Sequence, residues 1–210
     1  MVLRVHSDAS YLSAPKARSR AGGYFFLASK SPTDNTINGA IHVEAKIMRN
    51  VMASSAEAEI GSLFINAQTT LPLRVALTEL GHPQPPTPIQ TDNSMAASFA
   101  DSTVKQKRSK TIDIRYYWLQ DRQSQKQIRV FWATKHTNLA DYFTKRHPET
   151  HHVQIRPFII SENTDNPKYL SLTDLPNQPN AMDPEPLPSF SKTQDTQVSQ
   201  QSFHQAERVC

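Results

Sequence analysis

The sequence holds a single cysteine among its 210 residues, Cys210 at the last position. One thiol cannot build an internal disulfide framework or a cysteine-rich zinc site, so both kinds of small-fold stabilisation are excluded. This scarcity fits a reducing, intracellular setting, with cytoplasm and nucleus both left open. The sequence has no apolar run as long as a membrane span, and residues 1–8 reach charge too early for a secretory signal, so no membrane partner is expected.

Glycine is also scarce, with five residues in all and none in residues 151–210. That segment instead holds seven of the fifteen prolines and is mostly polar. Because so few apolar residues cannot offset the entropy lost on ordering the chain, we expect a disordered tail there. The sequence therefore predicts one folded domain over residues 1–150 followed by a disordered polar tail over 151–210, with no internal repeat.

Charge is divided in the same way along the chain. Residues 1–150 contain 19 Lys and Arg against 12 Asp and Glu, a net charge of +7, whereas residues 151–210 contain 4 against 7, a net of −3. A basic folded part can attract polyanions such as nucleic acid. A merely soluble basic surface has the same composition, so charge alone does not decide between the two.

Apolar patterning predicts an α/β fold with a mixed five-stranded sheet and helices packed on it. Strands are expected at Val2–Tyr11, Tyr24–Ala28, Asn38–Val51, Ile89–Asp92 and Gln127–Thr134. Helices are expected from Ser54, Leu73, Asn93, Thr111 and Asn138 onward. The first three strands follow one another closely, which favours an antiparallel meander. Trp118, Trp132 and the run Tyr24-Phe25-Phe26 are expected in the core.

The helix beginning near Ser54 carries two glutamates, Glu57 and Glu59. Ser54 is a favourable N-cap, and Glu57 three residues later completes a capping box. Ile60, Leu63, Phe64 and Ala67 then follow at helical spacing, which predicts an apolar face packed on the sheet.

Three aspartates, Asp8, Asp92 and Asp141, also lie in or at the ends of predicted elements. In a sheet covered by helices, these three and one glutamate of the helix can converge at one edge. Carboxylates gathered in this way can share two divalent ions, the arrangement used to hydrolyse phosphodiesters. Many chains of this length carry scattered acids, so the pattern alone only suggests such a site.

Over residues 5–150 the chain resembles the ribonuclease H domain at the C-terminal end of copia-type long-terminal-repeat retrotransposon Pol polyproteins. The matching segments are Ser7-Asp8-Ala9-Ser10, Arg20 with Gly23-Tyr24, Ser54–Glu59, Thr91-Asp92-Asn93-Ser94, Arg108–Tyr116, and Leu139-Ala140-Asp141 with Thr144-Lys145. Each segment is a weak signal alone, and their shared order and spacing make the resemblance specific.

The resemblance implies a ribonuclease H-like fold and an endonuclease that cuts the RNA strand of RNA–DNA hybrids. It implies two Mg²⁺ ions, with Mn²⁺ as an alternative, held by Asp8, Glu59, Asp92 and Asp141. A reverse transcriptase region of the parent polyprotein is a further expected partner. The chain begins at its first strand without a polymerase region, so it is expected to be a piece of such a polyprotein.

Helical position does not choose between Glu57 and Glu59, because both flank the apolar stripe. Glu57 is accounted for by the capping box, and Glu59-Ile60-Gly61-Ser62 matches the wider family better, so Glu59 is the expected ligand. Glu57 and His136 are retained as accessory candidates. Contacts to nucleic acid are expected from Arg20, Asn93, Lys105, Lys107, Arg108 and Lys110, with a solvated basic turn as the alternative for the lysines. His147, His151 and His152 are expected to be solvated.

Two other functions remain open at this stage. One is a catalytically inactive, transposon-derived module that binds nucleic acid or a protein. The other uses the same fold to cut DNA, as integrases do, although their acidic pattern differs from the one found here.

Overall fold

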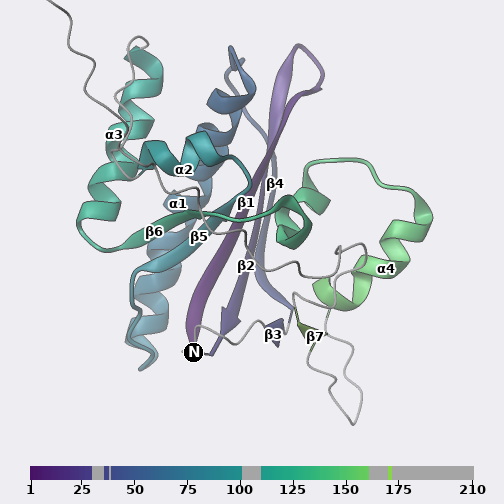
Figure 1. The fold of residues 1–210 in the computed structure, drawn as a ribbon. Helices are drawn as coiled ribbons and strands as arrows, with labels where there is room; N and C mark the ends of the chain where they lie inside the picture. The colour runs from purple at the N-terminus through teal and green to yellow at the C-terminus, as the bar shows by residue number, and fades with distance from the viewer. Residues whose placement is uncertain (30–35, 38, 101–109, 161–169, 172–210) are drawn as a thin grey trace, which may run out of the picture. The chain divides into compact units, whose positions relative to one another are not determined.

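The computed structural model describes residues 1–29, 36–37, 39–100, 110–160 and 170–171. Its main sheet contains β1 (Val2–Ala14), β2 (Arg18–Ala28), β4 (Ala40–Ile47), β5 (Thr87–Thr91) and β6 (Ile128–Trp132), in the spatial order β4-β2-β1-β5-β6 (Figure 1). β1, β2 and β4 pair antiparallel, whereas β5 runs parallel to β1 and β6 parallel to β5. A second, two-stranded pair joins β3 (Thr36–Ile37) to β7 (Leu170–Ser171). The predicted mixed five-stranded sheet with an antiparallel meander is confirmed.

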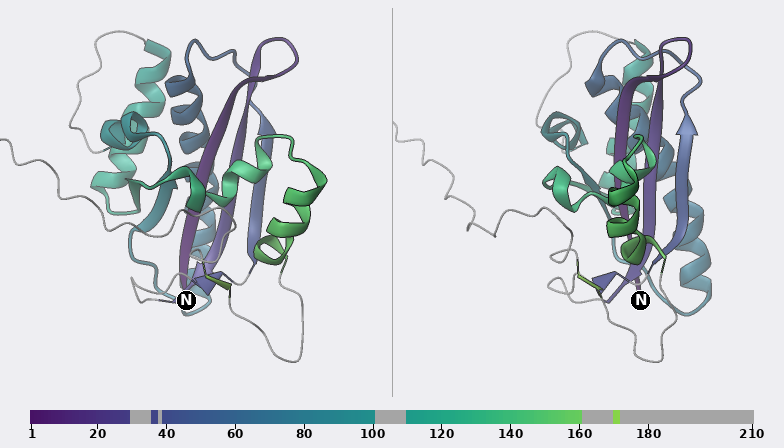
Figure 2. Two further views of the ribbon diagram at one scale, coloured as in Figure 1. Left: turned by 45° about the vertical axis from the view of Figure 1, so that its right-hand side comes forward. Right: turned by 90° about the vertical axis from the view of Figure 1, so that its right-hand side faces the viewer.

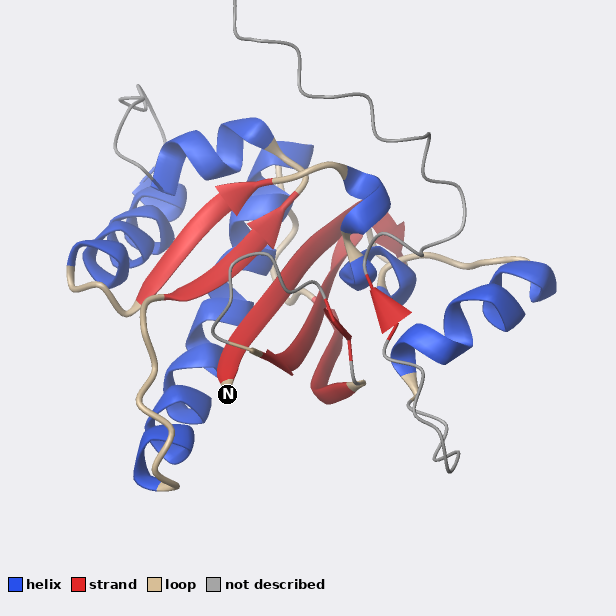
Figure 3. Cartoon of the chain, turned by 60° about the horizontal axis from the view of Figure 1, so that its bottom comes forward, coloured by secondary structure: helices blue, strands red, loops and turns tan. Residues whose placement is uncertain are grey.

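The helices are α1 (Ser55–Glu79), α2 (Ser94–Ala100), α3 (Lys110–Ser124) and α4 (Glu149–Ile159), with two short 3₁₀ segments, η1 (Lys135–Thr137) and η2 (Leu139–Phe143) (Figure 3). Within the described ranges, no helix has the length and apolar character needed to cross a bilayer.

The prediction of separate helices from Ser54 and from Leu73 is wrong, because α1 runs unbroken for 25 residues and contains Pro72. A proline inside a helix costs about 3 kcal/mol, since it removes one backbone hydrogen bond and crowds the preceding turn. Leu71 and Leu73 on either side of it pack against the same core cluster, and Leu77 is buried there. Packing along the whole helix therefore offsets the local cost.

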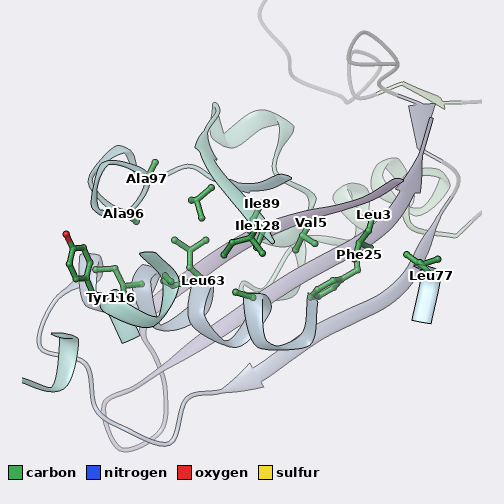
Figure 4. Close-up of a cluster of buried hydrophobic side chains, with 14 residues drawn as sticks. Leu3, Val5, Phe25, Leu63, Leu77, Ile89, Ala96, Ala97, Tyr116 and Ile128 are labelled. Carbon is green, nitrogen blue, oxygen red and sulfur yellow. The ribbon is translucent and has the colours of Figure 1, made fainter. Parts of the chain in front are cut away.

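Strand alternation distributes the aromatic run of β2 over both faces of the sheet. Phe25 lies with Leu3, Val5 and Leu63 in the cluster between the sheet and α1 (Figure 4). Tyr24 and Phe26 point to the other face, where they join Ile155 and Phe158 of α4. Figure 2 shows the ribbon from two further sides. The sheet is thus covered on both sides, which confirms that this run belongs to the core.

The last predicted helix begins differently from the expectation. From Asn138 the chain forms only the five-residue η2, and α4 follows after a short connection. α4 extends past residue 150, where the sequence analysis placed the start of a tail, and its Ile155 and Phe158 are buried. Most of the remaining tail lies outside the described residues.

Of the two tryptophans expected in the core, Trp118 is partly buried and packs edge-on against Phe64 at 5.1 Å. The prediction is wrong for Trp132, which is 53% exposed. β6 is an edge strand and Trp132 is its last residue, so only one neighbouring strand flanks it.

Candidate metal centre

Strand register places Asp8 and Asp92 side by side. The parallel ladder between β1 and β5 pairs Val5 with Ile89 and His6 with Gln90. Asp8 and Asp92 each follow this ladder by two residues, one within β1 and the other just after β5. Parallel strands that leave a ladder in register deliver such residues to the same edge of the sheet.

Glu59 completes the group from the second turn of α1. One carboxylate oxygen each of Asp8, Glu59 and Asp92 lies within 4.8 Å of the others. Glu59 Oε1 accepts a hydrogen bond from the Ala9 backbone N–H at 3.2 Å. Glu59 Oε2 is buried and has no hydrogen-bond partner among the described residues. We call Asp8, Glu59 and Asp92 the carboxylate cluster.

The other glutamate of the helix has a local structural role. Ser54 Oγ accepts a 3.1 Å hydrogen bond from the Glu57 N–H, and Glu57 Oε2 accepts a 2.6 Å bond from the Ala53 N–H. The first bond satisfies a backbone donor that the first turn of the helix leaves free, and the second ties Glu57 to the residue before the N-cap. Glu57 therefore serves the start of α1, whereas Glu59 lies in the cluster.

A buried polar stripe on α1 fixes the helix against the strands that carry the cluster. Ser62 Oγ donates to the Asp8 carbonyl at 2.7 Å. Asn66 Nδ2 donates to Ser7 Oγ at 2.8 Å and to the Gly22 carbonyl at 2.9 Å. No role was expected for Ser62 or Asn66 from the sequence. Their four-residue spacing beside the apolar stripe was the available signal, because polar residues on a buried helical face need partners.

Burial dominates the electrostatics of the cluster. It raises the pKa of Asp8 to about 6, with the nearby Asp141 and Asp92 charges acting in the same direction and the Thr144 hydroxyl and Lys145 opposing it. It also raises the pKa of Glu59 to about 9, with the Asp8 and Asp92 charges adding to the effect. Crowded, desolvated carboxylates of this kind favour protons or a metal cation.

Asp141, the fourth predicted ligand, lies in η2 beside the cluster but outside the group of three. Its Oδ1 forms an ion pair with Lys145 and lies 3.6 Å from Lys135 Nζ. Lys145 Nζ also lies 3.9 Å from Asp8 Oδ2. The structure therefore brings three of the four predicted acids together and places a lysine between the fourth and Asp8.

Two residues of η2 and its cap are anchored to β1 by groups that the sequence analysis did not single out. Asn138 Nδ2 donates to the Ser7 carbonyl at 2.8 Å. The Leu139 N–H donates to His6 Nδ1 at 3.1 Å, and burial lowers the pKa of His6 to about 3. His6 is thus a neutral acceptor whose proton is on Nε2. No local pattern marks a histidine in a strand for this role.

The remaining predicted contact residues are dispersed. Arg20 lies partly buried in β2, and His136 is exposed in η1. Asn93 Oδ1 accepts from the Ala96 N–H at 3.1 Å, so this side chain caps α2. Lys105, Lys107 and Arg108 fall outside the described residues, and Lys110 begins α3.

The three histidines expected to be solvated gather around Tyr142. The ring of His147 stacks on Tyr142 at 5.2 Å and on His151 at 4.4 Å. His152 Nδ1 and the Tyr142 hydroxyl share a hydrogen bond of 2.7 Å. His152 is exposed, whereas His147 and His151 are partly buried.

No protein-family model matches the chain. It is 26% identical over 144 residues to the retrovirus-related Pol polyprotein from transposon TNT 1-94 of Nicotiana tabacum, over 69% of this chain and 10% of that protein. The chain thus spans about a tenth of that relative's length. A solved structure of LC11-RNase H1 with an RNA/DNA hybrid matches with a TM-score of 0.49 at 10% identity, over 67% of this chain and 92% of that chain. The PFV RNase H domain matches with a TM-score of 0.43 at 17% identity, over 68% of this chain and 90% of that chain.

Proposed function

We propose that this ribonuclease H-like domain, which resembles a region of copia-type retrotransposon Pol polyproteins, is a metal-dependent endonuclease that cuts the RNA strand of RNA–DNA hybrids. The observation that carries the proposal is the carboxylate cluster, in which three acids from separate elements bring their oxygens within 4.8 Å of one another. Gathering these acids lowers the stability of the folded protein, because like charges in a buried site repel one another. A chemical role for the cluster would account for this loss of stability.

The cluster fits a hard divalent cation. Its donors are carboxylate oxygens, which Mg²⁺ prefers and which Mn²⁺ also accepts. Glu59 Oε2 is buried with no hydrogen-bond partner among the described residues, so a cation would satisfy it. Asp8, Glu59 and Asp92 would hold this ion, and Asp141 would be the further carboxylate for a second ion. A bound ion of this kind supplies an activated water and neutralises charge that develops on the phosphate.

The chain's own residues would keep the carboxylates in place during turnover. Ser62 holds the backbone of Asp8, and the Thr144 hydroxyl donates to Asp8 Oδ2. The Ala9 N–H orients Glu59 through Oε1. Ligands fixed by neighbouring hydrogen bonds in this way lose little freedom when they bind a metal or a phosphate.

RNA–DNA hybrid is the proposed substrate because of the motifs shared with copia-type ribonuclease H domains. Recognition of the RNA strand would depend on contacts to its 2′-hydroxyl groups, which distinguish RNA from DNA. A reverse transcriptase region from the same parent polyprotein would be the natural partner for delivering this substrate.

The test is cleavage of a labelled RNA–DNA hybrid by the purified protein with Mg²⁺ or Mn²⁺. We expect the wild type to cut the RNA strand and Asp8→Asn and Asp92→Asn to lose more than about 100-fold in rate, as expected when groups acting together are removed. Asp121→Asn is the matched control, because Asp121 is an exposed acid on α3. The proposal fails if the wild type leaves the hybrid intact while a known ribonuclease H cuts it in the same buffer.

The position of Asp141 favours one second candidate, a domain that binds nucleic acid without cutting it. Asp141 is engaged by Lys145 and lies 3.6 Å from Lys135, which would keep it from serving as a ligand. Salt-sensitive binding of the hybrid, with no cleavage in either metal, would support this candidate over the nuclease.

A further inference from the structure

Trp132 lies directly beside the carboxylate cluster. It is the last residue of β6, where it pairs with Thr91, the residue before Asp92. Its indole Nε1 donates a 3.0 Å hydrogen bond to the Asp92 carbonyl. The residue is nevertheless 53% exposed, so its side chain is bound to Asp92 without being buried.

The hydrogen bond determines which part of the ring is left to bind a partner. An indole has one polar donor, its N–H, and here that donor is already used within the protein. What remains exposed is apolar ring surface, which binds other flat groups through its π-face and does not read hydrogen-bonding patterns. A partner held by this ring would therefore be recognised by stacking.

The chain that follows Trp132 is held firmly and is basic. The Ala133 N–H donates to the Thr91 carbonyl at 3.0 Å, and Gln90 Nε2 donates to Thr137 Oγ1 at 2.8 Å. These bonds attach both ends of residues 133–137 to β5. Lys135 and His136 are exposed on this segment. The aromatic ring of Trp132, the cation of Lys135 and the imidazole of His136 thus lie on one segment that is hydrogen-bonded to β5 beside the cluster.

We propose that Trp132 is a stacking platform for a nucleotide of the substrate strand, next to the phosphate that the carboxylate cluster addresses, with Lys135 facing a neighbouring backbone phosphate. Aromatic stacking combined with nearby cations is how proteins grip a nucleic acid strand without reading its sequence. This inference rests on the proposed function, because it assigns the partner of the same site.

The two tryptophans allow a direct test by fluorescence. Trp118→Phe leaves Trp132 as the only tryptophan, and Trp132→Phe leaves only Trp118, which lies partly buried on α3 against Phe64. Each protein is titrated with an unlabelled RNA–DNA hybrid in Ca²⁺, and tryptophan emission is recorded. We expect the hybrid to quench the protein that keeps Trp132 and to leave the protein that keeps only Trp118 nearly unchanged. Equal quenching in both proteins, or none in the first while the hybrid binds, overturns the inference.

Affinity measurements separate stacking from the tether to Asp92. Trp132→Phe keeps an aromatic ring but loses the N–H, whereas Trp132→Ala loses both. Stacking predicts that Trp132→Ala weakens hybrid binding about 5- to 100-fold, while Trp132→Phe stays within about 3-fold of wild type. If Trp132→Phe binds as weakly as Trp132→Ala, the ring acts only by holding Asp92 and the inference fails.

The outcomes also separate this inference from the proposed function. Quenching and a loss of affinity in Trp132→Ala, with no cleavage by the wild type, would reject the nuclease and keep the stacking platform. Cleavage by the wild type, with hybrid affinity and KM unchanged in Trp132→Ala, would keep the nuclease and reject the stacking platform.

Discussion

Ser62 and Asp8, 54 residues apart in the sequence, are joined by a 2.7 Å hydrogen bond from the Ser62 hydroxyl to the Asp8 backbone carbonyl. Ser62 lies one turn of α1 beyond Glu59, so this bond fixes the distance between the helix and the strand that supply two of the three clustered acids. The same hydroxyl accepts a 3.3 Å bond from Asn66, which makes it the centre of the polar stripe.

Ser62→Ala should therefore destabilise the protein by about 1–3 kcal/mol, because it leaves buried polar groups unpaired. Urea unfolding measures this loss. Ser124→Ala is the matched control, since it removes a hydroxyl that bonds the Asp121 carbonyl on an exposed surface. A loss no larger for Ser62→Ala than for Ser124→Ala would show that the bond does not hold α1 on β1.

Glu57→Ala and Glu59→Gln should affect different properties. Glu57→Ala removes the bond to the Ala53 N–H and should cost about 0.3–1.5 kcal/mol of stability, with the metal response intact. Glu59→Gln should remove the rise in melting temperature that Mg²⁺ or Mn²⁺ produces in the wild type. Melting curves with and without metal check both results. If Glu57→Ala lost the metal response and Glu59→Gln kept it, Glu57 would be the ligand.

The raised pKa of Glu59 predicts how metal-free stability depends on pH. The pKa of Glu59 is about 9 in the folded protein, whereas a glutamate exposed to water has a pKa of 4.5. The folded state therefore holds the proton more tightly, so this stabilisation is complete below pH 4.5 and is lost as the pH rises through about 9. The pKa of Asp8 is raised from 3.8 to about 6, so Asp8 also stabilises the folded state less as the pH rises through this range. The pKa of His6 is lowered from 6.5 to about 3, so His6 lowers the stability as the pH falls from 6.5 to about 3.

Glu59→Gln isolates this effect because His6 is the same in both proteins. In the presence of EDTA, the free energy of unfolding of Glu59→Gln should rise relative to that of the wild type between pH 5 and pH 8. The relative gain should be on the order of 1–3 kcal/mol at pH 8. Urea unfolding at several pH values measures the difference. A constant difference across the range would mean that the Glu59 carboxyl is not desolvated.

Lys145→Met should strengthen metal binding. The Lys145 ammonium forms an ion pair with Asp141 and lies 3.9 Å from Asp8 Oδ2, so it opposes a cation at the cluster. Removing a charge at this separation should raise Mn²⁺ affinity about 5-fold, from an interaction on the order of 1 kcal/mol. Isothermal titration with Mn²⁺ gives the affinity, and Lys46→Met, which removes an ion pair with Glu44 on β4, is the control. Unchanged or weaker binding in Lys145→Met contradicts the prediction.

Gly22→Ala should disturb the cluster through η2, because Gly22 pairs with Asp8 across β1 and β2 and faces Thr144 on the same side of the sheet. A Cβ there would lie 2.5 Å from Thr144 Cγ2 and 2.7 Å from the Ala140 carbonyl oxygen. Because the backbone of η2 cannot yield cheaply, we expect a loss of about 1–3 kcal/mol and weaker metal binding, as Thr144 moves away from Asp8. Gly81→Ala, at φ +87 with open space around it, should cost about 1–2 kcal/mol of stability without changing metal binding. Equal metal affinity in both variants would show that η2 moves without consequence.

Several features of the fold could be predicted because they depend on neighbours in the sequence. Ser54 caps the Glu57 N–H as its spacing predicts, although the Glu57 carboxylate accepts from the Ala53 N–H in place of the Ser54 N–H of a capping box. The alternation in β2 places Phe25 and Phe26 on opposite faces. The prediction of two helices in place of α1 was wrong, because the packing of Leu71, Leu73 and Leu77 that keeps Pro72 within one helix was not visible in the sequence.

The candidate site was less predictable. The shared motifs pointed to Asp8, Glu59 and Asp92, which the structure brings together. The ion pair of Asp141 with Lys145 and the exposed position of Trp132 had no local signal. Both depend on where η2 and the end of β6 come to lie.

Local sequence patterns predicted the five strands of the main sheet, the start of α1 at Ser54 and the acids available to the site. Long-range packing brings Asp8 and Asp92 out of one parallel ladder in register, and the Ser62 hydrogen bond positions α1 so that Glu59 lies beside them. The ion pair of Lys145 with Asp141 depends on the same packing. Capping and alternation depend on residues a few positions apart, whereas the cluster depends on contacts across 50 or more residues, which exist only after the sheet and α1 have packed.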